Sequence, residues 1–267
     1  MKTHCGRALF VTFLALLVGC AVNPVTGKRE LALISRDQEI ALGRESGPKF
    51  ETEFEGKVAN PELQTYVAAV GSRVAAVSDR PMPYEFALLN SDIPNAFALP
   101  GGKVYITRGL FKIMTNERQL AAVLGHEVGH VSAKHISQML NRQLGAAILI
   151  EVAGGGEATA GQVAQVVANM VDLSFSRDQE YQADQLGIKY MAKAGYNPHG
   201  MVELLTHLQS LSQSEPGRLT EMFQTHPLTS KRIAEAAGIV KTGYPSADAA
   251  KGDPNAKRFL DMRTILK

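Results

Sequence analysis

The 267-residue sequence contains no tryptophan, and only 6% of its residues are aromatic. Few aromatic side chains disfavour the stacking platforms with which many proteins bind single-stranded nucleic acid. A basic excess is also missing, because 28 Lys and Arg residues stand against 26 Asp and Glu, for a formal net charge of +2. Without a basic excess to attract phosphates, we expect no nucleic-acid partner.

Cysteine is scarce, since Cys5 and Cys20 are the only two in the chain. Long apolar runs are missing too, as no stretch reaches the roughly 18 residues that indicate a membrane-spanning helix. Together these absences exclude a scaffold built on several disulfides and a chain that crosses a bilayer repeatedly. The composition is otherwise that of an ordinary globular protein, with 45% hydrophobic and 20% charged residues.

Residues 1–19 form a distinct segment. Lys2 and Arg7 precede a twelve-residue apolar run at 8–19. A basic front followed by a short apolar run is typical of a secretory signal peptide, which is removed from the mature chain. Removal would take away two basic residues and no acid, so the mature chain would be formally neutral.

Cys20 ends the sequence LVGC, which resembles the lipobox of bacterial lipoproteins. Chains of that class are cut before the cysteine, which is then acylated, whereas the alternative is an ordinary signal peptide with an incidental cysteine. By the same resemblance Ala21, which is not an aspartate, favours the outer membrane over the inner one. We therefore expect a protein anchored by lipid on Cys20 to the periplasmic side of the outer membrane, with no disulfide left after Cys5 is removed.

We expect a signal peptide at 1–19, a lipidated tether at 20–34 and one domain at 35–241. A polar tail, at best partly ordered, should follow at 242–267. The domain should be mostly helical with one small sheet, an α+β fold. We predict helices from Ser35 (with a capping box to Gln38), over 61–78, over 116–140, over 175–195, over 198–212 and in 215–232, a strand over 84–90, and a hairpin of 95–99 and 103–107 with its turn at Pro100-Gly101-Gly102. Residues 144–172 should form two helical pieces, which could pack in the core, cover the functional site or touch the membrane.

The sequence HEVGH at 126–130 matches the H-E-x-x-H pattern. A step of four residues places His126 and His130 about 40° apart on one face of a helix, where both imidazoles can reach one ion. Glu127 lies about 100° round from His126, so it is poorly placed as a ligand but could take a proton from a water beside the ion. Apolar neighbours predict a buried helix, and buried histidines need partners, which a zinc ion would provide.

His135 and two glycines complicate this helix. His135 lies five residues after His130, about 140° round a continuous helix, so we expect a surface group or a partner behind a ligand rather than a third ligand. Gly125 and Gly129 together lower the helix propensity, which indicates close approach of a strand or substrate, or tight helix packing.

A third zinc ligand should then be a carboxylate from elsewhere in the chain. The sequence SRDQEYQAD at 176–184 offers Glu180 and Asp184 on one face of a helix. One could bind the ion while the other accepts a hydrogen bond from a histidine, although two acids at this spacing more often lie on a solvated helix face.

Four segments, taken in order, resemble the zinc metallopeptidase family of HtpX and the CAAX prenyl protease. They are NAFALPGG at 95–102, HEVGH at 126–130, SRDQEYQAD at 176–184 and THPLTSKRI at 225–233. The segments NPVTG and AGYNP resemble the periplasmic lipoprotein branch of that family, which includes LoiP and BepA. The resemblance covers most of the mature chain, and it implies a zincin-like metallopeptidase domain with one zinc ion.

The resemblance also implies roles for single residues. Glu180 becomes the third zinc ligand, and Asp184 becomes the partner that orients a histidine. The strand Asn95, Ala96, Phe97, Ala98 and Leu99 becomes an exposed edge that pairs with an extended substrate, where the alternative is a purely structural hairpin. His226 either stabilises the oxyanion of peptide hydrolysis or enters the fourth zinc position and closes the site, if it has a catalytic role at all.

We therefore expect a zinc endopeptidase in which Glu127 is the general base and then passes its proton to the leaving amine. Its substrates would be extended, misfolded or unassembled periplasmic proteins, with the outer-membrane assembly machinery as a possible partner. The alternative is a chaperone-like binding lipoprotein whose zinc is structural or whose site stays closed. A zinc with four protein ligands would favour that alternative, whereas a catalytic zinc keeps one position open.

Overall fold

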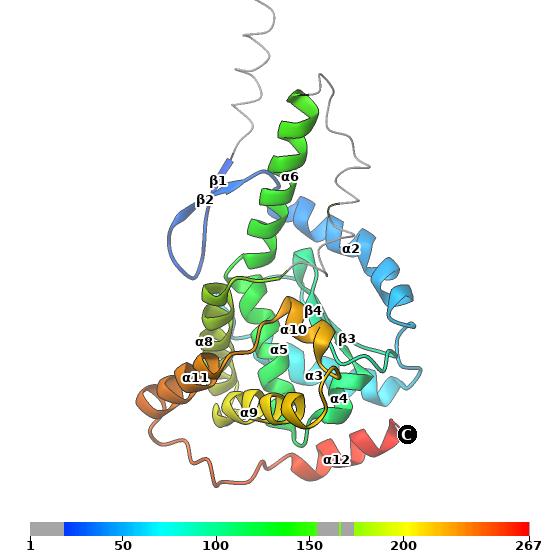
Figure 1. Ribbon diagram of the computed structural model, residues 1–267, viewed down its shortest axis with the longest axis vertical. Helices are drawn as coiled ribbons and strands as arrows, with labels where there is room; N and C mark the ends of the chain where they lie inside the picture. Colours follow the sequence, from blue (N-terminus) through cyan, green and yellow to red (C-terminus); the bar gives the residue numbers. More distant parts are fainter. Residues whose placement is uncertain (1–18, 154–165, 167–173, 267) are drawn as a thin grey trace, which may run out of the picture.

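The computed structural model describes residues 19–153, 166 and 174–266 (Figure 1). The expected signal peptide therefore lies almost entirely outside the described residues, as does most of the second helical piece expected within 144–172. None of the helices in the described ranges combines the length and the apolar character needed to span a bilayer.

A three-stranded sheet lies beside the central helix. Its strands are β3 (Glu85–Leu89), β4 (Ala96–Ala98) and β5 (Lys103–Thr107), in the order β3-β5-β4. The middle strand β5 pairs parallel with β3 and antiparallel with β4. A 3₁₀ turn, η1 (Pro100–Gly102), joins β4 to β5, and both of its glycines have positive φ angles of 80° and 98°. The predicted hairpin with its turn at the glycines is confirmed.

Helices make up most of the remaining described chain, which confirms the mostly helical α+β class. Several begin where the sequence provides caps: Ser35 and Ser176 form capping boxes, and Asn60 caps a helix that starts with Pro61. The helices are α2 (Arg36–Glu53), α3 (Pro61–Ala75), α4 (Arg108–Ile113), α5 (Glu117–Ser132), α6 (His135–Ala153), α8 (Arg177–Lys193), α9 (His199–Ser214), α10 (Thr220–Thr225), α11 (Ser230–Gly243) and α12 (Ala256–Ile265).

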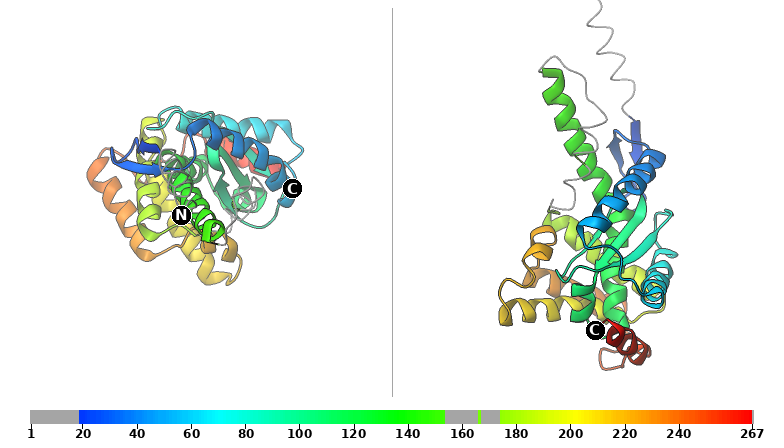
Figure 2. Two further views of the ribbon diagram at one scale, coloured as in Figure 1. Left: turned by 90° about the horizontal axis from the view of Figure 1, so that it is seen from above. Right: turned by 90° about the vertical axis from the view of Figure 1, so that its right-hand side faces the viewer.

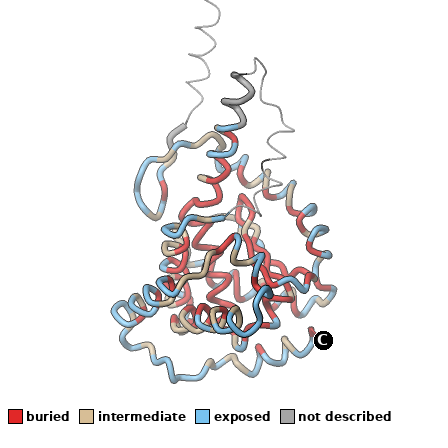
Figure 3. The backbone as a smooth tube through the Cα atoms, viewed as in Figure 1, coloured by how far each residue is buried: buried red, intermediate tan, exposed pale blue. Residues whose placement is uncertain are grey.

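Helix α5 forms the centre of the fold, and all of its residues are buried (Figure 3). It packs against β4, α3, α8 and α9. The approach to α8 is closest at two glycines: a Cβ on Gly129 would lie 2.9 Å from the Ala183 carbonyl oxygen, and one on Gly125 would lie 3.3 Å from that of Gly187. Of the two explanations for these glycines, tight helix packing is the one that the structure supports.

The prediction of one helix over 116–140 is wrong, because the helix breaks at Ala133 and Lys134. Lys134 has a φ of 61°, the left-handed conformation that commonly ends a helix, and α6 starts anew at His135. The carbonyl oxygen of Ala133, freed by the break, accepts a hydrogen bond of 2.8 Å from the Asn23 side chain. A distant segment of the chain thus stabilises the break, which explains why local helix propensity did not reveal it.

That distant segment is a second, two-stranded sheet in the region expected to be a tether. Strand β1 (Gly19–Val22) pairs antiparallel with β2 (Arg29–Ala32). The Asn141 side chain on α6 accepts a hydrogen bond from the Leu33 amide and donates one to the Leu31 carbonyl, at 3.1 and 2.9 Å. The expectation of a single sheet is corrected accordingly, and the hairpin lies beside α6 at one end of the molecule (Figure 2).

The region after residue 242 also differs from expectation, because it contains α12. Phe259 on this helix is fully buried, and its ring stacks on that of Phe111 with the centroids 5.1 Å apart. The predicted polar, partly ordered tail is therefore wrong for this part, since an apolar residue every third or fourth position in a short helix suffices to attach it to the core.

Candidate metal centre

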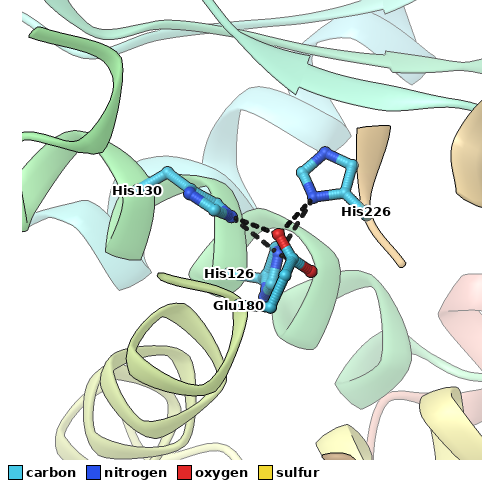
Figure 4. Close-up of side chains that lie close together, drawn as sticks. All are labelled: His126, His130, Glu180 and His226. Carbon is cyan, nitrogen blue, oxygen red and sulfur yellow. Dashed lines mark hydrogen bonds and ion pairs between the residues drawn. The ribbon is translucent and has the colours of Figure 1, made fainter. Parts of the chain in front are cut away.

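Four side chains from two helices and the end of a third converge on one point (Figure 4). His126 and His130 come from adjacent turns of α5, Glu180 comes from the first turn of α8, and His226 caps the end of α10. Each offers one ligand atom, and these atoms all lie within 4.8 Å of one another. All four residues are buried, with Glu180 and His130 at 0% exposure.

The spacing of these atoms suits a tetrahedral zinc ion. His126 Nε2 lies 3.0 Å from His130 Nε2 and 3.3 Å from His226 Nδ1, and Glu180 Oε1 lies 3.2 and 3.1 Å from the latter two nitrogens. Ligand atoms about 2.1 Å from a tetrahedral zinc lie about 3.4 Å from one another. The other carboxylate oxygen, Glu180 Oε2, forms an ion pair with the Arg232 guanidinium, which leaves Oε1 facing the three nitrogens. Three nitrogens and one carboxylate at this spacing fit one zinc ion.

The charges of the ligands favour the same conclusion. Burial holds the pKa of His130 well below its ordinary value, so this imidazole is neutral. Burial alone would raise the pKa of Glu180, but the neighbouring His226 and His126 rings hold it well below its ordinary value. A neutral imidazole and an ionised carboxylate are the forms that bind zinc.

Asp184 and Arg232 lie behind the ligands. The Asp184 Oδ1 atom is 2.9 Å from His126 Nδ1, and the Arg232 guanidinium donates two hydrogen bonds of 2.7 Å to the Asp184 carboxylate. Arg232 also forms an ion pair with Glu180. The sequence pattern predicts no role for Arg232, although this residue belongs to the segment THPLTSKRI at 225–233. Its signal was a basic residue six positions after His226, which is informative only once the two acids are known to be buried.

Glu127 lies beside the four converging groups. Its Oε1 atom is 3.7 Å from His226 Nε2, and burial raises the pKa of its carboxyl group. The same burial would lower the pKa of His226, but the carboxylates of Glu180 and Glu127 raise it above its ordinary value. A small cavity of about 30 Å³ adjoins Glu127 and His126 and reaches Ala96 on β4. The helix and the edge strand therefore border a common space.

The residues Asn95 to Leu99 lie at an edge of the sheet, because β4 is one of its two outer strands. All of their side chains are buried except that of Ala98, which is half-buried. The Asn95 carbonyl accepts a hydrogen bond from Thr107, and the Leu99 amide donates one to Lys103, both toward β5. By the alternation of an antiparallel ladder, Ala96 and Ala98 direct their backbone groups to the free edge.

His135 is buried with 1% exposure, so of the two expectations for it the surface group is wrong, and its contacts support a partner behind a ligand. The break after α5 turns its ring back toward the site, where its Nδ1 atom lies 3.0 Å from His130 Nδ1. Its Nε2 atom lies 2.8 Å from Gln182 Oε1. Burial lowers the pKa of His135 to about 4, which leaves the ring neutral at pH 7.

Comparisons with known proteins agree with the chemistry of this cluster. The sequence model of a family described as "Peptidase family M48" matches residues 61–240. The chain is 32% identical over 264 residues to the "Beta-barrel assembly-enhancing protease" of Yersinia pestis, covering 91% of this chain and 51% of that protein. It is 28% identical over 214 residues to the "Mitochondrial metalloendopeptidase OMA1" of Schizosaccharomyces pombe, covering 79% and 63%.

A third relative is the "Metalloprotease LoiP" of Escherichia coli, which is 30% identical over 175 residues that cover 64% of this chain and 66% of that protein. The chain spans about half the length of the assembly-enhancing proteases that it matches. The similarity therefore concerns the region that contains the cluster and leaves out large parts of those proteins.

Proposed function

The chain belongs to peptidase family M48, whose members depend on zinc, and we propose that it is a zinc endopeptidase. One observation carries the proposal: Glu180, 50 residues beyond His130 in sequence, lies with His126 and His130 around a single point. This arrangement provides two imidazoles and a carboxylate, the ligand set of many hydrolytic zinc sites. His126, His130 and Glu180 would hold the ion.

Zinc in this position would polarise a peptide carbonyl and favour the deprotonation of a nearby water. Glu127 takes the proton of the attacking water and passes it to the leaving amine. The raised pKa of its buried carboxyl group suits this exchange, because a general base works best when its pKa lies near the operating pH. Asp184 holds the ring of His126 with the other nitrogen toward the ion.

The substrate would be an extended polypeptide that pairs with the free edge of β4. The Ala96 carbonyl and the backbone groups of Ala98 face that edge, whereas the Ala96 amide already donates a hydrogen bond to the Asn95 side-chain oxygen. Pairing through the backbone tolerates many sequences, which suits misfolded or unassembled proteins as substrates. The small cavity that Ala96 and Glu127 both line supports this assignment, because a peptide on the edge strand would lie next to the catalytic glutamate.

We also assign the protein to the cell envelope, anchored by an acyl chain on Cys20 to the periplasmic side of the outer membrane. The LVGC sequence at 17–20 supports acylation, and the printed name of the Yersinia pestis relative links that protein to β-barrel assembly. A role near the outer-membrane assembly machinery follows as part of the same proposal.

The test is cleavage of casein by the zinc-loaded protein and by a Glu127→Gln variant. The variant should retain zinc, because Glu127 lies outside the four converging residues, and should lose most of its turnover. Replacing a general base typically slows a reaction about 10²–10⁴-fold. Undiminished turnover with zinc retained would refute Glu127 as the base. A wild-type protein that binds no zinc would refute the proposal that it is a zinc endopeptidase.

The position of His226 favours a second candidate function. Its Nδ1 atom lies 3.1 Å from Glu180 and 3.3 Å from His126, where it completes a set of four protein ligands. If the site stays closed in this way, the protein would be a chaperone-like binding lipoprotein with a structural zinc. A His226→Ala variant distinguishes the two: it should cleave casein faster if His226 closes an active enzyme, and should remain inactive if the protein only binds.

A further inference from the structure

Two buried imidazoles face each other behind the proposed zinc site. His130 Nδ1, the ring nitrogen that points away from the ion, lies 3.0 Å from His135 Nδ1. His130 is 0% exposed and His135 is 1% exposed, so water cannot satisfy either nitrogen. At this distance one nitrogen must carry a proton and donate it, and the other must accept.

Gln182, the other hydrogen-bond partner of His135, fixes the direction of the hydrogen bond between His130 and His135. His135 Nε2 lies 2.8 Å from the Gln182 side-chain oxygen, which can only accept. His135 must therefore carry its proton on Nε2 and leave its Nδ1 lone pair free. The His130 ring then donates from Nδ1, and its Nε2 lone pair points to the cluster with His126 and Glu180.

We propose that His135 is a positioning residue that, held by Gln182, fixes the His130 ring in the tautomer and orientation that bind the ion. The inference rests on the proposed function, because it takes His130 as a zinc ligand. His126 has a different partner for the same purpose, the carboxylate of Asp184. The two ligands of one helix are thus oriented by different groups, an anion for one and a neutral imidazole for the other.

Two further contacts hold His130 and His135 in place. The Phe175 ring lies against His130 with the ring centroids 3.8 Å apart, which restricts rotation of the imidazole. The helix break at Lys134 gives His135 its direction, because on a continuous helix the side chain would point about 140° away from His130. Asn23, bound to the Ala133 carbonyl, stabilises that break.

The decisive measurement is the tautomer of His135 in the zinc-loaded wild-type protein, read from its ¹⁵N-labelled histidine NMR signals. We expect the proton on His135 Nε2 and a coupling through the hydrogen bond from His130 Nδ1 to His135 Nδ1. A proton on His135 Nδ1 would overturn the inference, because both facing nitrogens could not then carry one.

Variants provide the matching affinity measurement, made with Zn²⁺ and a competing chelator. His135→Leu removes the acceptor, whereas in His135→Asn the side-chain oxygen takes the place of Nδ1. Loss of an orienting partner typically weakens metal binding about 10–100-fold, so we expect that loss for His135→Leu and Gln182→Met but not for His135→Asn. His207→Leu on α9 controls for the removal of a histidine elsewhere.

Equal zinc affinities of the Leu and Asn variants would overturn the inference while leaving the proposed function intact. A wild-type protein that binds no zinc would instead refute the proposed function itself. The NMR measurement needs no substitution, so it decides the question even if a variant fails to fold.

Discussion

Asp184 Oδ1 lies 2.9 Å from His126 Nδ1, on the side of the imidazole opposite the nitrogen that faces the cluster. Arg232 donates two hydrogen bonds to the same carboxylate. These neighbours determine whether Asp184 is ionised. Burial alone would raise the pKa of Asp184, but Arg232 and His126 lower it below its ordinary value. One ionised, buried acid therefore connects a ligand of α5 to α11.

Replacing Asp184 with Asn should destabilise the protein, since the amide removes the carboxylate that pairs with the buried Arg232 through two hydrogen bonds. Breaking a buried ion pair costs about 3–5 kcal/mol. Chemical denaturation of the metal-free proteins would measure the loss. Asp178→Asn, an exposed position on the same helix, is the control. Equal stabilities of the two variants would contradict a structural role for the pair.

Gly129→Ala should weaken the packing of α5 on α8. The new methyl group would lie 2.9 Å from the Ala183 carbonyl oxygen, so the helices must move apart. Overpacking of this kind costs about 1–3 kcal/mol, measured as a lower free energy of unfolding. Gly238→Ala on α11 is the matched control, since nothing lies within 4 Å of its added carbon. That control should gain up to about 1 kcal/mol of helix propensity.

Phe259→Ala should show whether α12 belongs to the folded core. The ring is fully buried against Phe111, and deleting a buried Phe side chain costs about 3–5 kcal/mol. The neighbouring Leu260→Ala, at a side chain that is 41% exposed, should change the unfolding free energy far less. If both substitutions left the melting temperature unchanged, α12 would not contribute to the core.

Asp79→Asn should lower stability at neutral pH but not in acid. Burial alone would raise the pKa of Asp79, but hydrogen bonds from Lys189 and Tyr190 lower it below its ordinary value. The stabilisation is then present above the unfolded-state pKa of about 3.9, and it is lost as the pH falls through the lower folded-state pKa.

The expected size of this effect is small, because the pair is partly exposed to solvent. A partly exposed ion pair contributes about 0.5 kcal/mol, which denaturant titrations at pH 7 and near pH 3 can resolve. A difference between wild type and Asp79→Asn that stayed constant across this range would contradict the linkage.

The sequence was sufficient where the signal was local. Caps at Ser35 and Asn60 mark helix starts that the structure contains, and the glycines at 101 and 102 mark the turn of the hairpin. The meeting of Glu180 with the two histidines of α5 was expected from a family resemblance, and the geometry agrees with it.

The sequence was insufficient where a distant contact overrides local preference. The residues near Lys134 do not predict the helix break, because the break depends on the Asn23 side chain more than 100 residues away. The role of Arg232 was equally hidden, since a basic residue in a loop-to-helix segment is ordinarily solvated. Its importance appears only when Asp184 and Glu180 are seen to be buried around it.

The hydrogen bond between Asn23 and Ala133 also limits how far the active site could reach. Cys20 lies three residues before Asn23, and three residues of extended chain span only about 10 Å. If Cys20 carries an acyl chain, the proteolytic centre would work at a nearly fixed, short height above the lipid. Its substrates would then have to be at the membrane surface, because so short a linkage would keep the active site close to the lipid.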